Sequence, residues 1–289
     1  MTDFIPWNSQ SLEEWAGKYA PGKFINLEGH FTHYIEKGEG EPVILLHGFG
    51  SDSYSWHKNI DALATKFRIY ALDLWGCGYS TREPLNYGYP LYTQQLLSFM
   101  DALNIERACL IGQSMGGGTI IKFTTEHRDR VKSIILVCAG GMPYKPLLTQ
   151  RIMALPGLGE FVLSLPTDLF RRLFIKRIYL YRKEVTPEYF NGLTWSQKVK
   201  GSNETYLKIL RLKFFHTLSN EIHYLSKMGV PTLIVWGRHD KGIPVRLGEE
   251  MHHILKDSRI EIFENSGHEP HDEEPEKFNQ VVIDFLAKH

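Results

Sequence analysis

The chain has 289 residues, of which 43% are hydrophobic and 12% aromatic, so it is long and apolar enough to bury a large core and is not a disordered protein. Its 33 basic residues balance its 33 acidic ones, and the charges are interleaved, which argues against a nucleic-acid-binding surface. A small, apolar molecule is therefore the expected partner, and no nucleic acid is expected.

The cysteines and the first residues of the chain give information on the cellular compartment of the protein. Cys77, Cys109 and Cys138 form no C-x-x-C pair, and two of them lie in apolar, strand-like segments, which indicates a reducing environment. The chain does not begin with a basic segment followed by about 7–15 apolar residues, as a secretory signal requires. No apolar run reaches the roughly 18 residues of a membrane span. These features predict a cytoplasmic protein.

Residues 1–22 are predicted to form an N-terminal extension. Ser11, with Glu14 three residues later, is typical of a capped helix start, and we expect the apolar face of this helix to pack on the body of the protein. Contact with a membrane surface through Trp7 and Trp15 is the alternative for this segment.

A β-hairpin is predicted next, over residues 24–27 and 31–35. From residue 43 onward, short apolar segments alternate with segments of helical length, which is the pattern of βαβ units. The expected strands are 43–46, 68–72, 108–111, 133–137, 232–236 and 259–263, and the expected helices lie near 55–65, 90–103, 116–127, 245–255 and 275–288. Because we interpret the strands as unbroken apolar runs, helices should cover both of their faces. The predicted fold class is α/β, with a mostly parallel sheet between helices.

This alternation stops between residues 143 and 228. No parallel strand is predicted there, and Leu, Phe, Tyr, Arg and Lys recur at helical intervals. Insertions of this length are seldom structureless. We therefore predict a helical cap at 143–228, inserted into a core domain made of residues 23–142 and 229–289.

A candidate nucleophile lies between a predicted strand and a predicted helix. Residues 112–116 read Gly-Gln-Ser-Met-Gly, and G-x-S-x-G in this context is typical of the turn that exposes a reactive serine. The glycines are needed because side chains two residues on either side of Ser114 would clash with the strand and the helix. The five-residue pattern also occurs by chance, so the prediction depends on the strand predicted before it and the helix predicted after it.

The residues His47-Gly48-Phe49-Gly50 follow the strand predicted at 43–46. A loop at this place can supply half of an oxyanion hole, and we predict that the backbone N–H groups of Phe49 and Met115 bind the oxygen on which charge develops. A glycine-rich turn without function is the alternative. His47 is expected to order the loop and not to act as a base.

His268 is the predicted base, because it stands in a loop after the strand at 259–263; His271 is its nearest competitor. Asp240, after the strand at 232–236, is the predicted acid that orients His268, although an aspartate before Lys-Gly is also common in turns. Three matches in the order Ser114, Asp240, His268 are far less expected by chance than any one of them.

Together these motifs resemble the α/β-hydrolase fold superfamily from about residue 24 to the C-terminus. The matching segments are His47–Gly50, Leu72–Ser80, Gly112–Gly117, Trp236–Asp240 and Gly267–His268 followed by Glu274-Pro275-Glu276. The resemblance is to its serine-nucleophile branch of carboxylesterases and lipases with a helical cap, and it implies that Asp73 is structural. It also implies that neither a metal ion nor an organic cofactor is needed.

The resemblance ranks the possible activities. Ser114 argues against haloalkane dehalogenases and most epoxide hydrolases of this fold, which use an aspartate nucleophile. Cleavage of a carboxylic ester of a small or medium apolar substrate, through an acyl-enzyme, ranks first. Carbon–carbon bond hydrolases of ring-cleavage pathways resemble the chain at Ser-Met-Gly-Gly but often carry a tryptophan where this sequence has Glu269, so they rank second. A non-catalytic ligand-binding receptor is the third possibility, and the oligomeric state stays open.

Overall fold

The computed structural model describes residues 4–176, 186–211 and 217–289. Eight strands form one sheet in the order β1-β2-β4-β3-β5-β6-β7-β8. Their bounds are β1 (Lys23–Leu27), β2 (His30–Lys37), β3 (Pro42–Leu46), β4 (Arg68–Leu72), β5 (Ala108–Gln113), β6 (Val131–Val137), β7 (Thr232–Gly237) and β8 (Arg259–Phe263). The pairs β1·β2 and β2·β4 are antiparallel and the others parallel. The predicted α/β fold with a mostly parallel sheet is confirmed.

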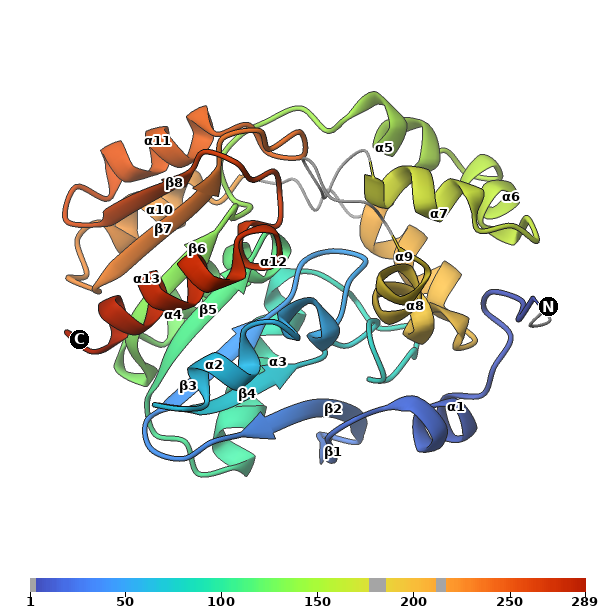
Figure 1. The fold of residues 1–289 in the computed structure, drawn as a ribbon, viewed down its shortest axis with the longest axis horizontal. Coiled ribbons are helices and arrows are strands. Elements are labelled where there is room, and N and C mark those ends of the chain that lie inside the picture. Colours follow the sequence, from blue (N-terminus) through green and yellow to red (C-terminus); the bar gives the residue numbers. More distant parts are fainter. Residues whose placement is uncertain (1–3, 177–185, 212–216) are drawn as a thin grey trace.

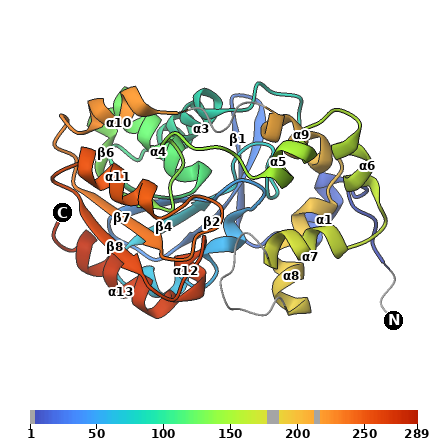
Figure 2. The same ribbon diagram turned by 90° about the horizontal axis from the view of Figure 1, so that it is seen from above.

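Alternation along the strands creates a core on each face of the sheet. In β3, Val43 and Leu45 pack on one face, whereas Ile44 and Leu46 pack on the other. The first face is covered by α2 (Ile60–Leu63) and α13 (Pro275–Leu286), and the second by α3 (Tyr89–Ala102), α4 (Met115–Glu126), α10 (Ser219–Leu225) and α11 (Arg246–Ile254). Figure 2 shows α13 on one side of the strands and α3, α4 and α10 on the other. Helices on both faces were expected from the apolar strands.

Two predicted elements differ in detail. The helix expected at 55–65 is divided into a short 3-10 helix, η1 (Ser53–Trp56), and α2, and the fully buried Asn59 between them donates to the carbonyl of His271 at 2.9 Å. Strand β8 is not buried on both faces: only Phe263 is buried, because β8 is the edge strand and pairs with β7 alone.

Most of the remaining helices lie together, apart from the helices that cover the sheet (Figure 1). They are α5 (Leu148–Met153), α6 (Leu158–Ser164), α7 (Leu169–Phe174), α8 (Pro187–Thr194), η4 (Trp195–Lys198) and α9 (Ser202–Arg211). α10 lies inside the segment expected to be the cap, yet its Ile222 and Leu225 pack in the core with α4 and α11. We therefore propose that the cap ends before α10, earlier than residue 228, because this helix buries its apolar face on the sheet domain.

The N-terminal extension packs on the cap. Helix α1 (Leu12–Tyr19) begins as predicted, with the Ser11 hydroxyl accepting from the Glu14 N–H at 3.1 Å. Trp15 stacks on Trp195 with 5.5 Å between ring centroids, and the Trp7 indole donates to the Thr167 carbonyl at 3.2 Å. Both indole rings are buried, in agreement with the expected packing of this segment on the body of the protein.

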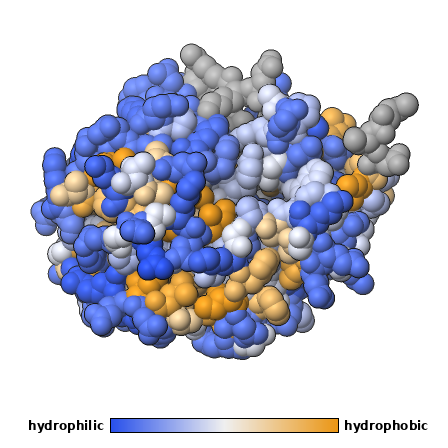
Figure 3. Space-filling view, turned by 60° about the horizontal axis from the view of Figure 1, so that its bottom comes forward, coloured by the Kyte–Doolittle hydropathy of each residue, from blue (hydrophilic) through white to orange (hydrophobic). Residues whose placement is uncertain are grey.

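The surface is polar over large areas, with apolar side chains gathered in a band on one face (Figure 3). Among the exposed apolar side chains, Phe24 and Phe31 of the β1–β2 hairpin are 42% and 56% exposed and lie edge to face, with 6.4 Å between ring centroids. No helix in the described ranges is long and apolar enough to span a bilayer.

Candidate active site

Ser114 occupies a strained turn between β5 and α4. Its φ is 50° and its ψ is −110°, a conformation that L-residues rarely adopt. A Cβ atom added to Gly112 would lie 2.5 Å from the carbonyl carbon of Gly116, and one added to Gly116 would lie 2.3 Å from the Leu46 carbonyl oxygen. The glycines are thus required by close backbone approaches, as the motif predicts, and the turn holds the half-buried Ser114 at the carboxyl end of β5.

The loop after β3 lies against this turn. A Cβ atom on Gly48 would lie 3.2 Å from the Ser114 Cβ. His47 is buried: its Nδ1 lies 2.8 Å from the Gly48 carbonyl oxygen, and its Nε2 accepts from the Leu74 N–H at 3.0 Å. Burial lowers the pKa of His47, so the neutral ring cross-links the loop to the end of β4. This is the ordering role expected for it.

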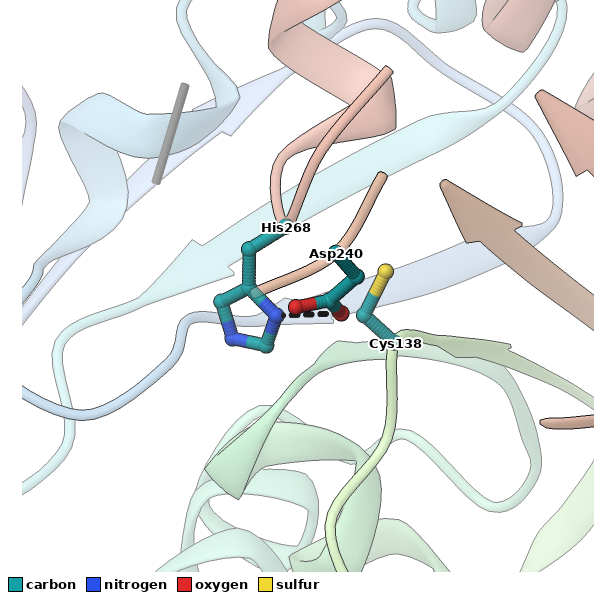
Figure 4. Close-up of side chains that lie close together, drawn as sticks. All are labelled: Cys138, Asp240 and His268. Carbon is teal, nitrogen blue, oxygen red and sulfur yellow. Dashed lines mark hydrogen bonds and ion pairs between the residues drawn. The ribbon is translucent and has the colours of Figure 1, made fainter. Parts of the chain in front are cut away.

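His268 and Asp240 form a buried pair beside the turn. The His268 Nδ1 lies 2.7 Å from the Asp240 Oδ2, and the two groups face one another in Figure 4. The other carboxylate oxygen accepts from the N–H groups of Gly242 and Ile243, at 2.7 and 2.8 Å. Asp240 is therefore fixed at both oxygens, and the neutral His268 ring must carry its proton on Nδ1, which leaves Nε2 as the basic atom.

One hydrogen bond joins the His268 loop to the turn around Ser114, and another holds the loop to the segment that follows it. Gln113, the residue before Ser114, donates to the His268 carbonyl at 3.2 Å, and the Gly267 N–H donates to the Glu273 carboxylate at 2.7 Å. The sequence analysis did not single out Gln113, because the G-x-S-x-G motif is recognised by Gly112 and Ser114 and allows any residue between them.

The competing histidine is placed differently. His271 is fully buried, and its ring lies 4.3 Å from that of Trp56. Within the described residues neither ring nitrogen forms a hydrogen bond, and Nε2 lies 3.2 Å from the Glu269 Oε2. Burial lowers its pKa to about 3. The structure pairs Asp240 with His268 and not with His271.

Cys138 also approaches this pair, from the other side of the carboxylate (Figure 4). Cys138, Asp240 and His268 offer three potential ligand atoms within 4.8 Å of one another. Burial raises the pKa of the Cys138 thiol well above its usual range, which disfavours the thiolate that zinc prefers. Both Asp240 oxygens already accept hydrogen bonds, so a histidine–carboxylate pair accounts for the cluster better than a metal site.

Asp73 belongs to a separate buried network. It accepts from the N–H groups of Ser53 and Tyr79, at 2.7 and 2.8 Å, and lies 2.7 Å from the His33 Nδ1. Burial opposes its ionisation, but His33, His47 and the Tyr79 N–H together outweigh burial and lower the pKa of Asp73. This arrangement agrees with the structural role implied for Asp73.

A cavity lies between the cap and the core, next to the predicted site. Core residues in its wall include Phe49 and Glu269, the latter directly after His268, and cap residues include Leu163, Phe170, Arg171 and Tyr206. Its walls are mainly apolar. The sequence analysis did not single out Arg171 and treated Glu269 only as a departure from a family pattern, since no local signal reports which side chains line a cavity.

The fold and the site now define the class of protein. The model of the α/β hydrolase fold family matches residues 41–275, and the chain belongs to this family. It is a hydrolase of that fold.

Particular relatives give a finer comparison. The chain is 30% identical to a 2-hydroxy-6-oxononadienedioate/2-hydroxy-6-oxononatrienedioate hydrolase of Paraburkholderia xenovorans, over 88% of this chain and 90% of that one. It is 28% identical to a 2-hydroxy-6-oxo-6-phenylhexa-2,4-dienoate hydrolase of Comamonas testosteroni, over 94% and 96% of the two chains. The solved meta-cleavage product hydrolase of Pseudomonas fluorescens has a TM-score of 0.81 at 26% identity and covers 92% of this chain and 98% of its own. These names favour the carbon–carbon bond hydrolase over the ester hydrolase that ranked first.

Proposed function

We propose that the protein is a serine hydrolase that cleaves the carbon–carbon bond beside the ketone of a 2-hydroxy-6-oxo-dienoate, with Ser114 as nucleophile, His268 as base and Asp240 as the orienting acid. The similarity to hydrolases named for such substrates supports the substrate class. These molecules carry a carboxylate at one end and a reactive ketone at the other, so their binding site needs a cation.

Arg171 is the observation that carries this proposal. Arg171 lines the cavity and is 8% exposed. Its guanidinium donates to the neutral side-chain oxygens of Gln197 and Asn203, at 3.1 and 2.9 Å, and lies over the Trp7 ring, 3.9 Å from the ring centroid. Among the described residues, no carboxylate lies within ion-pair distance of it. Burial lowers its pKa to about 10, so it remains charged at neutral pH.

Arg171 differs from Arg82 in how many hydrogen bonds its guanidinium donates within the described residues: two for Arg171 and four for Arg82. Arg82 also lines the cavity, but its guanidinium donates to the backbone carbonyls of Cys77, Gly78 and Ser80 and so cross-links its own loop. A buried cation that lacks an anionic partner is costly unless a ligand provides one. Arg171 is therefore the group we assign to the substrate carboxylate.

The first half of the reaction breaks the carbon–carbon bond. In its keto form the substrate is R–CO–CH₂–CH=CH–CO–COO⁻. His268 takes the hydroxyl proton of Ser114 as the oxygen attacks the ketone carbon, and the N–H groups of Phe49 and Met115 bind the resulting oxyanion. The carbon–carbon bond then breaks, its electron pair is delocalised onto the 2-oxo group, and the released carbon takes the proton from His268.

The second half restores the enzyme. Water gives a proton to His268 and attacks the acyl group on Ser114, which leaves as a carboxylic acid while Ser114 regains its proton. The net reaction consumes one water molecule and cleaves one carbon–carbon bond, without a cofactor.

Ester hydrolysis is the second candidate, because Glu269 replaces the tryptophan that many carbon–carbon hydrolases carry after the histidine and because the same proposed residues serve both reactions. An ester has a better leaving group, so it needs no stabilised carbanion. The two candidates differ in the bond cleaved, not in the nucleophile.

The deciding experiment compares two substrates with purified wild-type protein. We expect 2-hydroxy-6-oxo-6-phenylhexa-2,4-dienoate to be converted to benzoate with a kcat/KM about 100-fold above that for p-nitrophenyl butyrate. The reverse preference would make ester cleavage the function. Turnover of neither, together with no labelling of Ser114 by a fluorophosphonate, would refute the hydrolase mechanism and favour a binding protein.

A further inference from the structure

The N-terminal segment of residues 5–10 is hydrogen-bonded to the cap. The N–H groups of Ser9 and Gln10 donate to the Lys198 carbonyl, at 2.8 and 2.9 Å. The Lys200 N–H donates in return to the Gln10 carbonyl at 2.8 Å. A segment that is far from the cap in the sequence is therefore part of its structure, and its side chains pack among those of the cap.

Trp7 lies behind the wall of the cavity. Its ring is 8% exposed and forms one apolar cluster with Ile175, Tyr189 and Leu193. These three residues line the cavity, whereas Trp7 is not among the described residues that line it. The indole N–H donates to the Thr167 carbonyl at 3.2 Å, which fixes the ring in the plane that it adopts. Trp7 thus supports the wall from the side away from a bound molecule.

The Trp7 ring also holds the guanidinium of Arg171. The Arg171 Cζ lies 3.9 Å from the ring centroid. An aromatic face attracts a guanidinium that lies over it and takes none of its N–H groups, which point outward in the guanidinium plane. The Nε and Nη2 groups donate to Gln197 and Asn203, and Nη1 forms no hydrogen bond within the described residues. The ring therefore fixes the face of the cation and leaves the Nη1 donors for a ligand.

Asn8, the next residue, supports the same guanidinium through Asn203. The Asn8 Oδ1 accepts from the Asn203 N–H at 3.1 Å, near the start of α9. The Asn203 Oδ1 in turn accepts from the Arg171 Nη2 at 2.9 Å, and its Nδ2 donates to the Leu163 carbonyl at 3.2 Å. Two consecutive residues of the N-terminal segment thus act on Arg171, one directly and one through a single side chain.

Arg171 needs such support because of its place in the cap. It lies on the six-residue helix α7, which is too short to be stable without tertiary contacts. A second buried cation, the Lys198 ammonium, lies 3.2 Å from the Trp7 ring centroid. The ring attracts both cations and so offsets the repulsion between them. An arginine that is already ordered loses less side-chain entropy when it binds an anion.

We propose that Trp7 is a positioning residue of the substrate-binding site, which holds the Arg171 guanidinium in the orientation that binds the substrate carboxylate. The inference rests on the proposed function for the role of Arg171. It gives the N-terminal segment a part in recognition: residues 5–10 complete the carboxylate site of the cap from a distant part of the chain, although Trp7 itself touches no substrate.

Three variants test the role of the ring. Trp7→Leu removes the aromatic face, Trp7→Phe keeps a face but not the indole N–H, and Trp15→Leu is the matched control. Trp15 is also a buried indole of the N-terminal extension that donates to a carbonyl of the cap, at 2.9 Å, but none of the described residues in its apolar cluster lines the cavity. The loss of stability should therefore be similar in Trp7→Leu and Trp15→Leu, and a thermal melt of each measures it.

Calorimetry with 6-oxo-6-phenylhexanoate and its neutral amide, 6-oxo-6-phenylhexanamide, isolates the contribution of the carboxylate. We expect wild type and Trp15→Leu to bind the acid about 10-fold more tightly than the amide, and Trp7→Leu to lose most of this preference. In Trp7→Phe the preference should stay within about 3-fold of wild type, because a phenyl face still attracts the guanidinium.

Several outcomes would overturn the role of Trp7. A preference that is unchanged in Trp7→Leu, or lost equally in Trp15→Leu, would show that the ring does not act through Arg171. Equal weakening of acid and amide in Trp7→Leu would indicate a merely structural role. A preference as low in Trp7→Phe as in Trp7→Leu would exclude the aromatic face as the cause.

Kinetics give a second readout. With the phenyl dienoate, Trp7→Leu should raise KM about 10-fold and leave kcat within about 2-fold of wild type, because only the binding of the carboxylate is impaired. The neutral ester p-nitrophenyl butyrate should be hydrolysed as by wild type. An equal loss with both substrates would contradict the proposal.

Arg171→Met in the same calorimetry separates this inference from the proposed function. If Arg171→Met removes the preference for the acid and Trp7→Leu keeps it, only the role of Trp7 is wrong. If wild type shows no preference, or Arg171→Met keeps it, the carboxylate role of Arg171 is wrong and the role of Trp7 fails with it. If the preference depends on both residues but the phenyl dienoate is not turned over, the inference holds and the proposed reaction is wrong.

Discussion

The sheet edge and the cap contribute to this site in different ways. At the sheet edge, Ser114, Asp240 and His268 follow β5, β7 and β8, and backbone hydrogen bonds fix the turn and the Asp240 carboxylate. In the cap, Arg171 lies on the six-residue helix α7 and is held by side chains more than 20 residues away. Under the proposed function, the sheet edge would carry the chemistry and the cap would select the substrate. Four substitutions test this division, from the largest expected effect to the smallest.

Ser114→Ala should abolish the chemistry and leave binding intact. Removing a triad nucleophile in a comparable enzyme costs about 10⁶-fold in kcat, and we expect a loss of that order with the dienoate. Calorimetry should still detect 6-oxo-6-phenylhexanoate. Retention of more than about 1% of wild-type kcat would mean that the sheet edge acts through another group.

Asp240→Asn tests how far the buried pair orients the base. The amide cannot stabilise the His268 imidazolium and favours the wrong tautomer, so kcat should fall about 10⁴-fold with little change in KM. Steady-state kinetics and a thermal melt of the same preparation separate this effect from unfolding. A nearly normal rate would place the orienting acid elsewhere.

Arg171→Met should alter selection without altering the chemistry. Loss of a charge-assisted hydrogen bond predicts an increase of about 10–100-fold in the KM for the dienoate. The neutral ester p-nitrophenyl butyrate should be hydrolysed as by wild type. Arg172→Met is the matched control, because Arg172 stacks on the Phe190 ring and is not among the residues that line the cavity. If the Arg171→Met variant loses activity equally towards both substrates, the cap supports the chemistry as well.

Asp52→Asn tests the junction between the two regions, where the Ser196 hydroxyl of η4 donates to the Asp52 carboxyl group of the core. Burial and the charge of Asp73 raise the pKa of Asp52 from 3.8 to about 7. The folded protein therefore holds this proton more tightly than the unfolded chain does, and stability falls as the pH rises from about 4 through about 7.

The asparagine stays neutral, so Asp52→Asn should melt above wild type at about pH 9 and close to wild type at about pH 4. Thermal unfolding at the two pH values measures the difference. A variant that is less stable at both would show that the charged carboxylate is what joins cap and core.

Much of the fold was predictable because its signals are local. The strands β3 to β7 are short apolar segments between helices, and the turn around Ser114 needs glycines whatever the rest of the chain does. The interpretation of β8 and α10 was less accurate. We expected β8 to be covered by helices on both faces, but it is an edge strand. We assigned α10 to the cap, but it packs on α4. Both outcomes depend on neighbours that are distant in sequence.

The sequence by itself determined the class of fold, the tight turn around Ser114 and the positions of Ser114, Asp240 and His268 after their strands, because each depends on a few adjacent residues and on the geometry of a parallel sheet. Only the tertiary structure decided which polar groups meet: that Asp240 pairs with His268 and not His271, that Gln113 joins the two loops, and that Arg171 and Glu269 line one cavity. Burial and side-chain direction come from contacts between residues that are distant in sequence, and no local pattern reports them.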